Sequence, residues 1–336
     1  MPDGGARVLD AGLARSKHLL LLGADVTDDE VEALVLSRFP EAGRVNATVL
    51  ALTPQAAVEG PWAVPDPAAL GAGPEITQAY AITVPAQRGD PVPEGLRGLG
   101  GILDAFADGP PEGHELAIVE FAQAAARRLG GAVRVAGTGA LITPEPGVDL
   151  AVHSEVWLHP DALVHVLTPA LPGVALHLAP DSDPDPEPGA RPAAAPPTRP
   201  RPPAPAGTED LDEGERAWIH AEADAFDAHA LAAEPATEAY GAVHALPDGG
   251  TIAVEVEAEV SVPLVLEGLD WARSGVIRYD LRWFPAEPEA YHSAPLDAPA
   301  VAARERATVL VEGAARALLD AIGGETTDDD GFLVDP

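Results

Sequence analysis

The sequence contains no cysteine, which excludes disulfide bonds and thiolate chemistry. Basic residues are also scarce, because Lys and Arg together number 20 against 54 Asp and Glu, and Lys17 is the only lysine. Outside residues 179–209 there is no basic cluster, which argues against a nucleic-acid partner. No apolar run reaches the roughly 20 residues of a membrane span, and charges interrupt the N-terminus too often for a signal peptide. We therefore expect a cytoplasmic protein with no membrane partner.

The formal net charge of −34 is extreme for 336 residues. Three accounts fit it: a GC-rich genome that favours Arg, Ala, Gly and Pro codons, adaptation to salt, or a surface that binds a basic partner. Composition does not choose among them. Aromatic residues make up only 4% of the chain, so we expect modest cores built largely from Ala and Val.

A proline-rich stretch at residues 179–209 divides the chain. It holds eleven prolines between Pro180 and Pro205, and no Leu, Ile, Val, Phe or Trp lies between Pro180 and Thr208. Such a segment has no apolar surface to bury and predicts a disordered, extended linker. We therefore expect an N-terminal domain at residues 1–178 and a C-terminal domain at residues 210–336.

Hydrophobic periodicity predicts a mixture of helices and strands in both halves. The capping-box pattern Thr27-Asp28-Asp29-Glu30 opens a helix expected over residues 27–39. Further helices are expected over residues 115–129, 210–233 and 299–322, with short ones within 54–73 and over 161–167 and 262–269. Strands are expected over residues 18–22, 45–52, 78–84, 148–158, 174–178, 238–245, 251–258 and 275–284.

The two halves share an order of signals. A strand from Tyr80 to Pro85 resembles one from Tyr279 to Pro285, and an Ala-rich helix ending in Gly-Gly follows in each half. Shorter matches pair residues 58–62 with 266–271, and 139–142 with 331–334. These matches predict a tandem duplication of an α+β domain that packs helices on one face of a mostly antiparallel sheet, with ferredoxin-like topology as one form. Chance matches between Ala-rich, Gly-ended helices are the alternative.

Candidate sites for chemistry are few. His220, Asp224 and Asp227 lie at i, i+4 and i+7 of the expected helix, so one face carries an imidazole and two carboxylates that could hold a metal. We favour the simpler interpretation, a solvated polar face, and expect no bound metal. A second group is His153, Ser154 and Glu155 on an expected strand, with His159 and His165 beyond it; a hydrogen-bonded or exposed histidine is the favoured interpretation there too.

No sequence motif for a nucleophile elbow, a phosphate-binding loop, a zinc protease or a dinucleotide site occurs. We therefore expect no cofactor and assign no catalytic residue. The five tryptophans (Trp62, Trp157, Trp218, Trp271 and Trp283) are expected to anchor cores poor in large side chains rather than to bind a ligand.

The helix, Gly-Gly and strand at the end of each half loosely resemble small α+β domains of uncharacterised bacterial proteins, some of them linked to toxin immunity. The resemblance covers about 30 residues per half. Our leading hypothesis is a bacterial, non-enzymatic, two-domain interaction or regulatory protein whose acidic surface binds a basic protein partner, immunity-like in role. The alternative is a metal-dependent hydrolase that uses the helical face with His220. No small-molecule ligand is indicated.

Overall fold

The computed structural model describes residues 7–98, 101–106, 108–177, 239–291 and 296–336. The chain divides into a compact unit of Met1–Leu176 with Gly241–Pro336 and a second unit of His177–Tyr240. The predicted linker at 179–209 and the predicted helix at 210–233 lie outside the described residues. None of the helices in the described part of the chain is long and apolar enough to cross a membrane.

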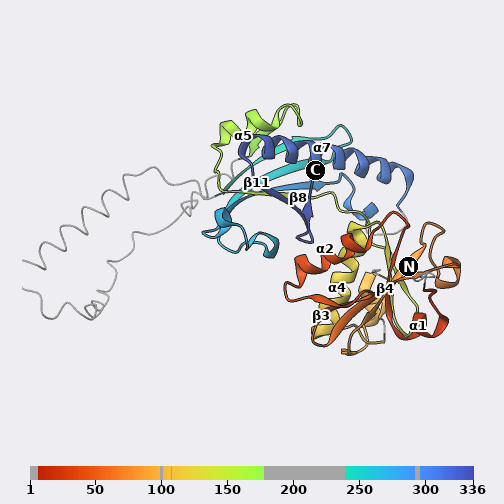
Figure 1. Ribbon diagram of the computed structural model, residues 1–336. Coiled ribbons are helices and arrows are strands. Elements are labelled where there is room, and N and C mark those ends of the chain that lie inside the picture. The colour runs from red at the N-terminus through yellow and green to blue at the C-terminus, as the bar shows by residue number, and fades with distance from the viewer. Residues whose placement is uncertain (1–6, 99–100, 107, 178–238, 292–295) are drawn as a thin grey trace, which may run out of the picture. The chain divides into compact units, whose positions relative to one another are not determined.

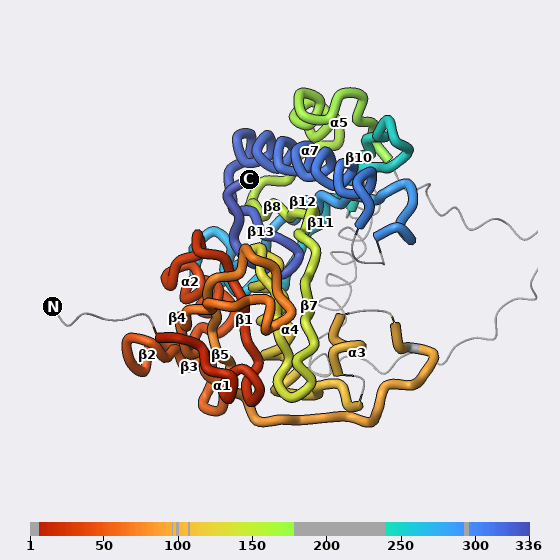
Figure 2. Tube along the Cα trace, turned by 90° about the vertical axis from the view of Figure 1, so that its right-hand side faces the viewer, coloured from red at the N-terminus to blue at the C-terminus, as the bar shows by residue number. Residues whose placement is uncertain are grey.

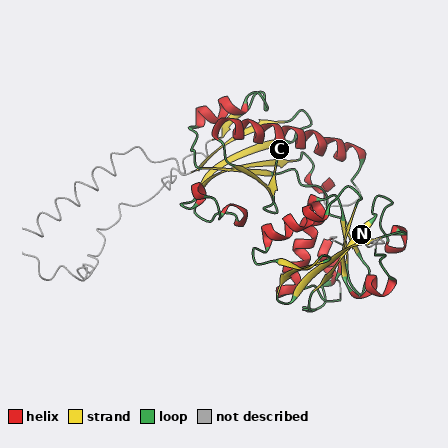
Figure 3. Ribbon diagram, viewed as in Figure 1, coloured by secondary structure: helices red, strands yellow, loops and turns green. Residues whose placement is uncertain are grey.

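The fold is α+β, with two seven-stranded sheets and helices packed against them (Figure 3). We call residues 18–142, with the short helix before them, the first module. Its strands are β1 (His18–Leu22), β2 (Gly43–Asn46), β3 (Val49–Thr53), β4 (Ala56–Ala63), β5 (Gln78–Thr83), β6 (Ala132–Arg134) and β7 (Leu141–Ile142). Its helices are α1 (Ala11–Ser16), α2 (Asp28–Arg38), η1 (Pro67–Leu70), η2 (Glu94–Leu96), α3 (Gly101–Ala105) and α4 (Gly113–Arg128).

Residues 150–334 form the second module. Its strands are β8 (Leu150–Ser154), β9 (Ala175–His177), β10 (Ala239–Ala245), β11 (Thr251–Glu259), β12 (Val276–Phe284), β13 (Glu325–Asp328) and β14 (Leu333–Val334). Its helices are α5 (Pro160–Leu167), η3 (Leu264–Leu266), η4 (Asp270–Ala272), η5 (Pro288–Tyr291) and α7 (Ala298–Ile322). In Figures 1 and 2, α5 and α7 lie together on one side of this sheet.

The two modules have the same topology. The first sheet has the strand order β2-β3-β4-β5-β1-β6-β7, and the second, read from its other edge, is β9-β10-β11-β12-β8-β13-β14. In both, a helix follows the first strand, and a long helix joins the fifth strand to the closing hairpin. The register agrees as well, since Leu20 of β1 lies opposite Tyr80 of β5 and Val152 of β8 lies opposite Tyr279 of β12. The chain thus contains one element order twice.

This repeat corrects the expected boundary at residue 178. Residues 150–177 precede the proline-rich stretch but belong to the second module, because β8 pairs with both β12 and β13. Residues 178–238 are therefore an insertion between β9 and β10, which are neighbours in one sheet.

Three of the four sequence matches correspond in the structure: Tyr80 with Tyr279, the helices ending in Gly-Gly, and the closing strands β7 and β14. The fourth does not, because residues 58–62 lie in β4 whereas residues 266–271 lie between β11 and β12. The ferredoxin-like form is not observed either. A ferredoxin-like domain has the order β-α-β-β-α-β, and each module here adds two strands before the long helix and one at the end.

The helix predictions agree with the structure where the residues are described. Thr27 caps α2, its hydroxyl accepting the Glu30 N–H at 3.3 Å while the Glu30 carboxylate accepts the Thr27 N–H at 2.7 Å. The strand predictions were less complete. The strand expected over 148–158 is shorter, because β8 ends at Ser154. The expected strand over 45–52 is a hairpin of β2 and β3, and the expected helix and loop over 54–73 contains β4. β4 was missed because its buried residues are small, Ala56, Val58 and Gly60.

The core of the first module lies on both faces of its sheet. One buried cluster joins Leu20, Leu22 and Tyr80 to α2 and α4, and a smaller one joins Leu19 and Leu21 to α1 and the segment around Val64. Because both faces are covered, β1 is a continuous run of buried residues. In the second module α7 buries Ala307, Val311, Ala314 and Leu318, and it contacts β8 and β12.

A buried ion network in the first module escaped the sequence analysis. Glu115 on α4 is 1% exposed, accepts the Gln87 N–H at 2.7 Å and pairs with Arg88 at 2.7 Å. His18 accepts the Ala136 N–H through Nδ1 at 3.2 Å, so its Nε2 carries the proton and donates to Glu115 at 3.1 Å. Burial is the main cause that lowers the pKa of His18, so the ring is neutral at pH 7. This network holds the segment after β5 against β1 and α4.

Candidate functional site

The metal candidates His220, Asp224 and Asp227 lie outside the described residues. Within the part of the chain that the structure describes, no group of three or more His, Asp or Glu side chains could hold a metal ion. The alternative of a metal-dependent hydrolase therefore has no described residue to carry it.

The second candidate group does not converge. His153 and Ser154 are buried in β8, where His153 Nε2 lies 3.0 Å from the Thr327 hydroxyl and Ser154 donates to the Ile322 carbonyl. Burial lowers the pKa of His153 to about 4, so its ring is neutral. Glu155 is exposed beyond the end of β8, His159 caps α5 by accepting the Asp161 N–H, and His165 is exposed on α5.

The tryptophans divide between core and cavity. Trp62 packs against the α1 side of the first sheet and Trp271 against the small cluster around Leu266. Trp218 lies outside the described residues. Trp283 differs, because it lines a cavity of about 230 Å³ at one end of the second sheet.

This cavity, which we call the Trp283 pocket, combines aromatic rings with carboxylates. Trp283 at the end of β12 and Tyr291 on η5 meet edge to face, with ring centroids 5.0 Å apart. The wall also contains the carboxylates of Glu145, Asp149 and Asp329. Trp283 Nε1 is buried without a hydrogen-bond partner among the described residues.

Three segments far apart in the chain bring the carboxylates together. Asp149 precedes β8 and accepts the Trp283 backbone N–H at 2.7 Å, which ties it to β12. Asp329 lies in the turn between β13 and β14. Because β8 lies between β12 and β13 in the sheet, two residues 180 positions apart reach the same cavity. No sequence motif could have shown this; the run Asp328-Asp329-Asp330 was the only visible signal.

Two of the pocket carboxylates, Asp149 and Asp329, lie where burial disfavours their ionised forms. Burial raises the pKa of Asp149 to about 6, and the charges of Asp329 and Asp280 add to the shift. Burial and the Asp280 charge also raise the pKa of Asp329. One cation also lines the pocket, Arg304, which pairs with Glu145. Arg282 pairs with Asp280 and lowers the pKa values of Asp149 and Asp329 without offsetting their burial. The three lining carboxylates thus outnumber the one lining cation.

Such an arrangement suits a cation. An ammonium or guanidinium group can lie against aromatic rings, a contact worth about 0.5 to 2 kcal/mol depending on its desolvation. The carboxylates would accept its N–H groups in charge-assisted hydrogen bonds. Among the described residues that line the pocket, none pairs a nucleophile with a base.

Comparisons of the chain with models of protein families, with curated proteins and with solved structures found no significant match, so the function rests on the residues and their geometry.

Proposed function

We propose that this protein is a non-enzymatic interaction protein that binds a basic protein partner through the acidic end of its second module. The observation that carries the proposal is the pocket in which Trp283 and Tyr291 meet Asp149 and Asp329. A Lys or Arg side chain of the partner would enter this pocket, with its charge near the two carboxylates. The neutralisation of a basic toxin is one role that fits this chemistry.

The charge of the whole chain supports the same proposal. With 54 acidic and 20 basic residues, most carboxylates have no cation to pair with. A basic partner would be attracted over a distance, since complementary charge speeds encounter. The pocket would then supply the local contact that an acidic surface alone lacks.

The raised pKa of Asp149 also favours a cationic partner. An ionised Asp149 destabilises the free protein, because the cost of its partial burial outweighs the charge of Arg282 and the Trp283 N–H. A bound ammonium or guanidinium group would lower the pKa of Asp149 and recover part of that free energy. Binding should therefore weaken as the pH falls through about 6, where the free protein takes up a proton at Asp149.

The test is titration of the purified protein with a 12-residue arginine-rich peptide, followed by calorimetry at pH 7.5 and low salt. Asp149→Asn combined with Asp329→Asn should weaken binding about tenfold or more. The matched control is Glu120→Gln combined with Asp320→Asn, which removes the same charge from exposed positions on α4 and α7. The control should bind like the natural protein. Equal weakening by both double variants would show that only net charge matters and would contradict the pocket.

A further inference from the structure

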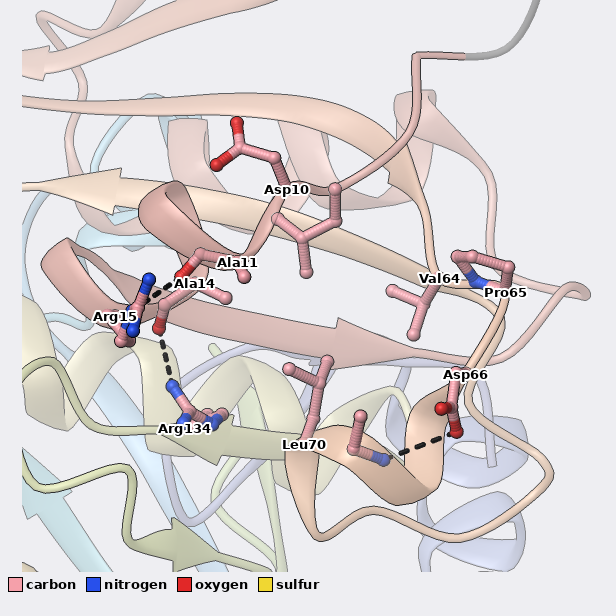
Figure 4. A pocket seen from close by; sticks show the side chains of 11 residues that line it. Asp10, Ala11, Ala14, Arg15, Val64, Pro65, Asp66, Leu70 and Arg134 are labelled. Carbon is pink, nitrogen blue, oxygen red and sulfur yellow. Dashed lines mark hydrogen bonds between the residues drawn. The ribbon is translucent and has the colours of Figure 1, made fainter.

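A second cavity lies in the first module, on the α1 side of its sheet, and has a volume of about 360 Å³. It lies between α1, η1 and β6, and we call it the α1 groove. Its apolar lining includes Leu9, Ala14, Val64 and Leu70. Figure 4 shows Val64 and Leu70 pointing toward the middle of the groove, from opposite sides. Its volume is within the range of small-molecule sites.

Two arginines form one end of this groove. Arg15 on α1 donates through Nε to the Ala11 carbonyl at 3.0 Å, and Arg134 on β6 donates through Nη1 to the Ala14 carbonyl. Figure 4 shows both side chains against α1, each with a dashed line to a backbone carbonyl of that helix. Nε of Arg134 is buried and has no hydrogen-bond partner among the described residues.

Neither of these arginines pairs with a carboxylate. Nine of the fifteen arginines in the described residues form ion pairs, and Arg15 and Arg134 are among the six that form none there. The chain has more than enough acid to pair with them. An anion in the groove would therefore meet two guanidinium groups whose charge no carboxylate pairs with, and guanidinium groups bind carboxylate-like anions through their N–H groups.

The two carboxylates of the groove are already engaged as helix caps. Asp10 accepts the N–H groups of Gly12 and Leu13, and in Figure 4 its carboxylate points away from Val64 and Leu70. Asp66 accepts the Ala69 N–H and lies at the end of the groove opposite the arginines. Neither carboxylate therefore balances the arginine end.

The fold itself does not require an arginine at position 134. Arg134 lies opposite Leu19 of the central strand, and in the second module the matching position, opposite Ala151, is Thr327. The same closing hairpin forms with a hydroxyl side chain there. The arginine end of the groove is therefore particular to the first module.

We propose that the α1 groove binds a small amphipathic anion, a molecule with a carboxylate or sulfonate on an apolar body. The anionic group binds Arg15 and Arg134, and the apolar body covers Leu9, Val64 and Leu70. This site is separate from the Trp283 pocket, which lies in the other module and is proposed to bind a cationic side chain.

Octanoate is a suitable probe, and calorimetric titration of the full chain measures its affinity. Octylammonium, with the same apolar body and the opposite charge, tests the role of the arginines. Arg15→Gln combined with Arg134→Gln should weaken octanoate binding at least tenfold. Arg97→Gln is the matched control, because Arg97 also donates to a backbone carbonyl, at Val92, but does not line the groove. It should leave the affinity unchanged.

A second variant guards against misfolding of the double arginine variant. Ala69 is exposed and lines the groove, so Ala69→Phe should fill the groove and abolish octanoate binding without altering the core. Three results would overturn the proposal: no octanoate binding by the natural protein at millimolar concentration, equal binding of octylammonium, or undiminished octanoate binding by Ala69→Phe. Neither set of variants should change the affinity for the arginine-rich peptide.

Discussion

At the scale of single residues, the structure separates groups that stabilise the fold from groups that destabilise it. Glu115 is almost fully buried, yet Arg88, His18 and the Gln87 N–H compensate its charge. For Asp149, burial and the charges of Asp329 and Asp280 outweigh the Trp283 N–H and the charge of Arg282, and its pKa is raised to about 6. A carboxylate with a strongly raised pKa is more typical of a functional site than of a structural one.

This contrast predicts a pH-dependent effect of Asp149→Asn. The folded protein holds a proton on Asp149 below about pH 6, whereas the unfolded chain releases it at the ordinary pKa of 3.8. Ionisation of Asp149 therefore lowers the free energy of unfolding as the pH rises through about 6. The asparagine can still accept the Trp283 N–H, so at pH 7.5 it should raise the free energy of unfolding by on the order of 1 kcal/mol. Urea unfolding at pH 7.5 and pH 4 measures the difference; a gain of equal size at both pH values would contradict the charge argument.

Neither the buried network around Glu115 nor the pocket around Trp283 was visible in the sequence. The candidate groups found there rested on helical spacing for His220, Asp224 and Asp227, which lie outside the described residues, and on a shared strand for His153, Ser154 and Glu155. Asp149, Asp329 and Tyr291 stand in no motif. They meet only because β8 lies between β12 and β13, which is long-range pairing that single-sequence patterns do not encode.

At the scale of elements, sequence patterns predicted most helices and the repeated order of strand, Ala-rich helix and closing strand. They did not predict the order of the strands within each sheet. Capping residues and apolar stripes identified α2, α4 and α7 to within two residues. The boundary of the modules could not be predicted, because the proline-rich stretch is the strongest compositional signal and yet interrupts a module. The Gly-Gly that ends each long helix was noticed, but its physical reason appears only in the structure.

The second glycine of each pair lies against the central strand. A Cβ added to Gly131 would lie 2.2 Å from the Leu21 carbonyl oxygen, and one added to Gly324 would lie 2.0 Å from the His153 carbonyl oxygen. Leu21 and His153 occupy matching positions in β1 and β8. Both modules thus use a glycine for the same close approach of helix end to strand.

We therefore expect Gly131→Ala to destabilise the protein by about 3 kcal/mol or more, because the clash is with backbone that cannot move aside. Gly130 provides the matched control. It has a φ of 63° but nothing within 4 Å of an added Cβ, so Gly130→Ala should cost only about 1 kcal/mol. Chemical denaturation of both variants gives the two values. A smaller loss for Gly131→Ala than for Gly130→Ala would show that the close approach is not a constraint.

At the scale of the whole molecule, charge repulsion should oppose the compact state. At −34, the carboxylates outnumber their possible partners, and the Debye length is about 10 Å at 0.1 M salt. Sodium chloride raised from low ionic strength to roughly 0.5 M should therefore raise the Tm, while it weakens a complex with a basic peptide. Thermal melts across this range check the first effect. A Tm that stays flat or falls would show that the charges are balanced locally.

One seven-stranded module occurs twice in the chain, and the second module is formed by chain on both sides of residues 178–238. β8 contributes five residue pairs to β12 and four to β13 across this insertion. Strands that pair over this length should hold the two parts of the chain together without a covalent link.

Co-purification of two separately encoded pieces, residues 1–178 and residues 239–336, tests this claim most directly. With an affinity tag on the first piece only, we expect both pieces to be recovered in equal amounts after expression in one cell. Val152→Asp, which places a charge at a fully buried position of β8, should abolish recovery of the second piece. Two pieces that purify apart, each folded by circular dichroism, would contradict the account and restore a division into independent domains at residue 178.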